Sequence, residues 1–108
     1  MATFDDFLHE LEDELKQLLD KGWKDFRNAA AADAKAFLAK AEEDLKRWTQ
    51  LLASRSLTLQ DFEFLLAAKK DVAELRALEA AGLAQVQLDR FINGVVGAII
   101  HAATTIFL

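Results

Sequence analysis

The sequence has 108 residues, of which 53% are hydrophobic and 29% charged, and its formal net charge is −5. A chain of this size and composition can bury a core, so we expect one helical domain over residues 1–108 and exclude a disordered segment. The sequence contains no cysteine, which excludes a disulfide framework and a thiolate nucleophile. Its negative charge argues against nucleic acid as a partner.

Helix-favouring residues dominate the composition. The sequence contains no proline and only four glycines, whereas alanine, leucine, lysine and acidic residues are abundant, and most of these cost little in a helix. We therefore predict an all-α fold, an elongated helical bundle. The start of the chain is acidic, the opposite of a positively charged signal-peptide segment. A cytoplasmic location is expected, with membrane association as the alternative.

The first predicted helix begins after Thr3, a suitable N-cap. Two columns of apolar residues recur at steps of eleven, which corresponds to three helical turns and keeps each column on one face. They are Phe4, Leu15, Phe26, Phe37 and Trp48, and Leu8, Leu19, Ala30, Ala41 and Leu52. The pattern predicts one helix over about residues 3–53, continuous or kinked at Gly22, although Gly22 can also be read as a C-cap that ends the helix. Such a rod would extend about 75 Å and would need a partner to cover it. Asp33 lies near its apolar face, and the pattern assigns it no role.

The second predicted helix spans about residues 59–81. Thr58 fits the N-cap and Asp61 the third helical position, an acidic variant of the capping box. Gly82 fits the residue that follows the helix, with leucines on either side of it at the spacing of a Schellman contact. The apolar residues of this helix cover a wide face, so we expect more than one neighbour to pack on it.

The last predicted helix spans about residues 84–107 and carries no formally charged side chain after Arg90. One half of it is bulky and apolar, whereas the other half is small and weakly polar and includes His101. Two unlike faces favour burial between helices, although the uncharged stretch is only marginally short of the length that spans a bilayer. A ridge of small residues at four-residue steps allows another backbone to approach closely. The ridge consists of Gly94, Ala98 and Ala102.

No catalytic or metal-binding motif is apparent in the sequence. His9 and Asp13 are four residues apart on a helix crowded with acids, so we read His9 as part of a solvated face. His101 is read as a hydrogen-bonded packing residue. No phosphate-binding loop, nucleophile elbow or di-iron motif occurs. We therefore expect a non-enzymatic protein with no catalytic residue, metal site or cofactor.

These features favour a structural or interaction protein that forms a homo-oligomeric helical bundle, with a dimer favoured, through its long first helix and its apolar last helix. The expected interface residues are Phe26, Phe37, Trp48, Phe91, Ile92, Gly94, Val95, Ala98, Ile99, Ala102 and Ile106. The alternative is a protein that associates with a lipid or membrane surface, although the first half of the chain is acidic. A third hypothesis is a small-molecule carrier that uses a cavity in the bundle.

Overall fold

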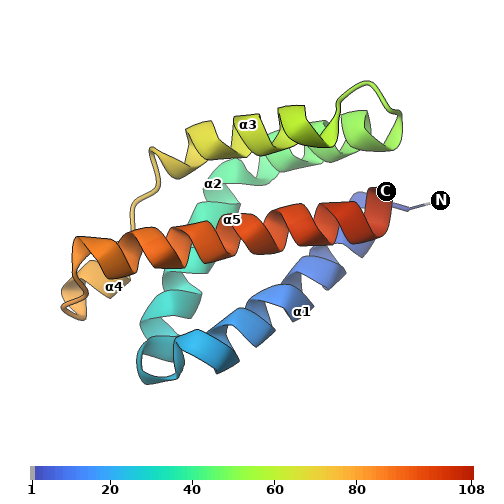
Figure 1. The fold of residues 1–108 in the computed structure, drawn as a ribbon. Coiled ribbons are helices and arrows are strands. Elements are labelled where there is room, and N and C mark those ends of the chain that lie inside the picture. The colour runs from blue at the N-terminus through green and yellow to red at the C-terminus, as the bar shows by residue number, and fades with distance from the viewer. Residues whose placement is uncertain (1) are drawn as a thin grey trace.

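The computed structural model describes residues 2–108, which form helices and their connections and contain no strand (Figure 1). The all-α prediction is confirmed. In chain order the elements are α1 (Phe4–Gly22), a short 3-10 helix η1 (Lys24–Phe26), α2 (Arg27–Ala53), α3 (Leu59–Lys70), α4 (Arg76–Ala80) and α5 (Gln85–Phe107). Helix α5 packs against α1, α2 and α3, with α1 and α3 on either side of it (Figure 1).

Threonine caps begin α1 and α3, as the sequence predicts. The Thr3 hydroxyl accepts a hydrogen bond from the Asp6 N–H at 3.2 Å, and the Asp6 carboxylate accepts one from the Thr3 N–H at 2.9 Å. The Thr58 hydroxyl accepts a hydrogen bond from the Asp61 N–H at 3.1 Å. The first N–H groups of a helix have no partner within it, so these side chains fix both helix starts.

The prediction of one continuous helix over residues 3–53 is wrong, because the chain turns back after Gly22. Helix α1 ends there, and η1 leads into α2, which packs against α1. Trp23 is buried at this turn, and its ring lies edge-on to Phe91 of α5 with the ring centroids 5.0 Å apart. Burial of this large ring against α5 stabilises the turn. No other helix approaches Gly22 closely, since a Cβ at this position would meet no atom within 4 Å.

Folding back also removes the extended rod that the eleven-residue columns implied. Residues 2–108 have principal extents of 42 × 24 × 19 Å, far shorter than the about 75 Å of a single helix. Leu15 in α1 and Phe37 and Trp48 in α2 are all buried. The two halves of the columns therefore face one shared core, and the need for a partner along a rod disappears.

The second predicted helix, over residues 59–81, is interrupted between α3 and α4. Asp33 of α2 is only 4% exposed, and its carboxylate accepts hydrogen bonds from the Ala77 N–H at 3.0 Å and the Leu78 N–H at 2.8 Å. Both N–H groups belong to the first turn of α4, where they lack helical partners and the helix dipole favours negative charge. Asp33, to which the sequence pattern gave no role, thus holds the start of α4 against α2.

A Schellman motif at Gly82 ends α4, as the sequence predicts. Gly82 has a φ of 94°, and its N–H donates to the Glu79 carbonyl at 3.0 Å. The Leu83 N–H donates to the Leu78 carbonyl at 3.2 Å, and both leucines are buried. Helix α5 follows, so the prediction of a last helix over residues 84–107 is confirmed.

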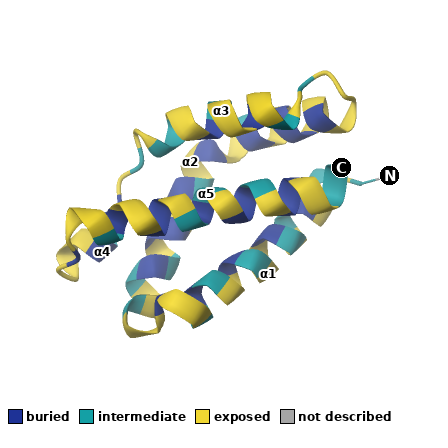
Figure 2. Ribbon diagram, in the orientation of Figure 1, coloured by how far each residue is buried: buried dark blue, intermediate teal, exposed yellow. Residues whose placement is uncertain are grey.

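All five α-helices contain buried residues, drawn dark blue in Figure 2, and their side chains form one continuous core. Phe91, Val95 and Ile99 of α5 have no exposed surface. At Gly94 the helices α1 and α5 come close, because an added Cβ would lie 3.0 Å from a Leu18 methyl carbon. The small-residue ridge therefore admits a neighbouring helix at Gly94, and that neighbour is α1 of the same chain.

Candidate functional site

Most of the residues expected at an interface lie in the chain's own core. Phe37, Trp48, Phe91, Ile92, Val95, Ala98, Ile99 and Ala102 are buried, and Phe26, Gly94 and Ile106 are half-buried. The apolar face of α5 is covered by other helices of the same chain (Figure 2). An interface built on the buried side chains would require the bundle to open. A surface that binds another molecule must therefore consist of residues that the bundle leaves exposed.

Helix α3 leaves a row of apolar residues uncovered. On its inner side, Phe62 and Leu66 have no exposed surface. On its outer side, Phe64 is 76% exposed and Val72, just beyond the helix, is 70% exposed. Ala68, between them, is exposed as well. Phe64 and Ala68 are four residues apart and therefore share one face of α3, and Val72 follows four residues later in the turn that ends the helix. We call Phe64, Ala68 and Val72 the outer stripe of α3.

An ion-pair network fixes the edge of α3 that lies next to α2. Asp44 of α2 has one carboxylate oxygen 2.5 Å from the Lys69 amine and the other 2.7 Å from the Arg47 guanidinium. The hydrogen bond from Lys69 lowers the pKa of Asp44; burial opposes this shift, and the positive charges of Lys69 and Arg47 add to it. The Val72 N–H donates to the Lys69 carbonyl at 3.2 Å, so Val72 lies in a turn that directly follows the last turn of α3.

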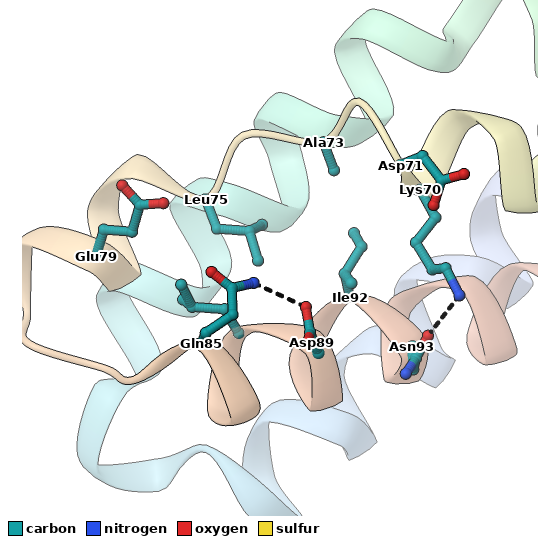
Figure 3. A pocket seen from close by; sticks show the side chains of 10 residues that line it. Lys70, Asp71, Ala73, Leu75, Glu79, Gln85, Asp89, Ile92 and Asn93 are labelled. Atoms are coloured by element: carbon teal, nitrogen blue, oxygen red, sulfur yellow. Dashed lines mark hydrogen bonds between the residues drawn. The ribbon is translucent and has the colours of Figure 1, made fainter.

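A polar cleft lies between the α3–α4 connection and α5 (Figure 3). Its volume is about 420 Å³. The Lys70 amine donates to the Asn93 side-chain oxygen at 3.1 Å, and the Gln85 amide donates to the Asp89 carboxylate at 2.8 Å. The charged residues that line the cleft are Lys70, Asp71, Glu79 and Asp89. The cleft thus supplies polar and charged contacts of both signs.

His101 is hydrogen-bonded, as expected, but it is not a packing residue. Its side chain is 65% exposed, and its Nδ1 lies 2.7 Å from a carboxylate oxygen of Glu14. The two residues are 87 positions apart in the sequence, so no local spacing could reveal the pair. Only the packing of α5 on α1 brings them together. His9 is exposed on α1, in agreement with a solvated face.

Helix α5 is the one helix among residues 2–108 that is long and apolar enough to cross a membrane. Its most apolar segment has a mean hydropathy of 1.3, and 33% of that segment is buried inside the bundle. Length and composition of this kind are also found in core helices of soluble proteins. In this fold α5 packs on three other α-helices.

No protein-family model matches the chain, and no curated protein or solved structure matches it. The comparisons therefore supply neither a family nor an activity. The exposure and contacts of the chain's own residues are the basis for a functional proposal.

Proposed function

We propose that the chain is a non-enzymatic interaction module that pairs with a second copy of itself through the outer stripe of α3. The observation that carries the proposal is the exposure of Phe64, which is 76% accessible on a helix whose inner side is fully buried. Aromatic side chains at interface centres contribute much of the binding free energy because they remove a large apolar area from water. Burying Phe64 in a partner would therefore favour association.

A second copy suits the shape of the outer stripe. In a twofold-symmetric dimer the same patch of both copies meets, so two α3 helices would cross with one stripe on the other. Ala68 is small and follows Phe64 by one turn, which leaves room for the partner's aromatic ring. The three residues of the stripe are uncharged, whereas Asp61 and Asp71 are exposed beside it, so both carboxylates have to stay in water at the rim of the dimer. Helix α3 already packs on α2 and α5, and such a dimer would add a neighbour on its outer side.

The other two hypotheses have less support. The lipid hypothesis rests on the apolar character of α5, but the fully buried face of that helix already packs within the bundle. The formal net charge of −5 opposes contact with anionic headgroups. The carrier hypothesis would use the cleft beside α5, but the lining of that cleft is mostly polar, whereas small-molecule pockets are lined mainly by apolar side chains.

Sedimentation velocity over a protein concentration series tests the dimer. We expect the wild-type chain to pass from monomer to dimer as its concentration rises, and the Phe64→Glu variant to stay monomeric because the dimer would bury a charge. Val86→Glu is the matched control, since Val86 is 80% exposed but lies on α5, outside the outer stripe. Far-UV circular dichroism checks that each variant keeps its helicity.

Two results would oppose the proposal. One is a wild-type chain that stays monomeric throughout the concentration series. The other is a dimer that Phe64→Glu and Val86→Glu weaken equally. Flotation of the wild-type chain with liposomes, together with a monomeric state in their absence, would favour the lipid hypothesis instead.

A further inference from the structure

Three side chains that can ligate a metal ion meet where α1 crosses α5. Glu10 and Glu14 belong to α1, and His101 belongs to α5. The Nδ1 atom of His101 lies 2.7 Å from a carboxylate oxygen of Glu14. One nitrogen or oxygen atom from each of the three residues can be chosen so that all of these atoms lie within 4.8 Å of one another. This cluster shares no residue with the outer stripe of α3.

Regular helices hold all three residues. Glu10 and Glu14 are one helical turn apart and therefore project from the same side of α1. They lie next to Leu11 and Leu15, which are buried in the core, so this part of α1 cannot rotate without exposing apolar surface. The close contact between Gly94 and α1 fixes α5 as well. Sites built on helices keep their geometry better than sites on loops.

The ligand set and its charge suit a divalent transition-metal ion. Imidazole nitrogen and carboxylate oxygen are both zinc ligands, and the imidazole favours zinc, copper or nickel over magnesium or calcium. Two carboxylates and one neutral histidine balance the charge of such an ion. Among residues 2–108, neither Glu10 nor Glu14 forms an ion pair with a lysine or arginine. We propose that Glu10, Glu14 and His101 bind one divalent ion of the zinc class, with water completing its coordination.

Binding requires a small rearrangement of the cluster, in which His101 Nδ1 and the Glu14 oxygen, now 2.7 Å apart, separate and the more distant ligand atoms approach. Ligand atoms around a tetrahedral zinc ion with bonds of about 2.0–2.1 Å lie about 3.3 Å from one another, whereas the three atoms here are spread over as much as 4.8 Å. Rotamer changes of the two glutamates can supply the difference, because both side chains are only partly buried. The ion then replaces the direct contact between His101 and Glu14.

Isothermal titration of the full chain with zinc chloride, in a buffer that does not bind zinc, tests the site. We expect one zinc ion per chain and a loss of affinity of at least about tenfold in both His101→Ala and Glu14→Gln. His9→Ala is the matched control, because His9 is exposed on α1 and has Asp13 one turn away. It should leave the affinity unchanged. Absence of saturable zinc binding by the wild type, or an equal loss in His9→Ala and His101→Ala, would overturn the proposal.

A second measurement needs no variant. In an NMR titration with zinc chloride, the ring signals of His101 should shift saturably at one equivalent of zinc while those of His9 stay in place. Shifts of both rings in parallel would show scattered surface binding and would overturn the proposal. Repeating the calorimetry on Phe64→Glu separates this site from self-association, since we expect that variant to bind zinc as the wild type does.

Discussion

Asp33→Ala should destabilise the protein through two backbone groups that lie far away in the sequence. The Asp33 carboxylate accepts the Ala77 N–H at 3.0 Å and the Leu78 N–H at 2.8 Å. An unsatisfied buried donor costs about 1–3 kcal/mol. The bond from Leu78 is buried and the bond from Ala77 partly buried, so we expect a total loss of about 3 kcal/mol. Asp33→Asn keeps one acceptor oxygen but points an N–H₂ donor at the other backbone N–H, so it should lose at least half as much.

Urea denaturation measures these losses as changes in the free energy of unfolding. Hydrogen exchange locates them, because the Ala77 and Leu78 amides should be protected in the wild type and exchange faster in Asp33→Ala. The control is Asp13→Ala, which removes an exposed carboxylate from α1 and should change stability by less than about 0.5 kcal/mol. If Asp33→Ala lost no more stability than this control, or if both amides exchanged quickly in the wild type, the capping role of Asp33 would be refuted.

Four further substitutions test the turns and the core, each by urea or thermal unfolding. Gly82→Ala should cost about 1 kcal/mol, because the φ of 94° at Gly82 disfavours any side chain. Arg55→Gly should stabilise by about 1 kcal/mol, since Arg55 occupies a left-handed conformation with a φ of 62°. Phe62→Ala should cost about 3–5 kcal/mol, because Phe62 has no exposed surface. Asp44→Asn should cost about 0.5 kcal/mol near neutral pH. Since the pKa of Asp44 is lowered from its ordinary value of 3.8, this contribution is complete above that value and is lost as the pH falls through the lower, folded-state pKa. The difference in unfolding free energy between Asp44→Asn and the wild type should therefore disappear in acid, and a difference that does not change with pH would contradict this role of Asp44. No change in stability for Gly82→Ala or Arg55→Gly would contradict the cost assigned to a left-handed side chain.

Helix ends that depend on neighbouring residues could be predicted from the sequence. Thr3, Thr58 and Gly82 each act through hydrogen bonds to groups within six residues, so their local pattern contains the necessary information. The turn at Trp23 could not be predicted in this way. An eleven-residue apolar pattern is satisfied equally by one straight helix with a partner and by two helices packed on a shared core. The choice depends on the contact of Trp23 with Phe91, 68 positions later.

The capping role of Asp33 and the pairing of His101 with Glu14 could not be predicted either, because both depend on contacts between residues that are far apart in the sequence. Asp33 and Leu78 are 45 positions apart, and His101 and Glu14 are 87 positions apart. The sequence indicated a wide apolar face on the second predicted helix, but it could not indicate which part of that face the rest of the chain would cover. Phe62 is buried and Phe64 exposed because only the α2 and α5 side of α3 has a neighbour within the chain.

Pairing of two chains through the outer stripe of α3 is tested most directly by isotope-filtered NMR on a mixture of labelled and unlabelled protein. Only contacts between different copies give signals in this experiment. We expect intermolecular nuclear Overhauser effects between the ring protons of Phe64 in one copy and the methyl group of Ala68 in the other. A dimer whose intermolecular signals come from other residues, or a sample with no intermolecular signals at high concentration, would contradict the proposed interface.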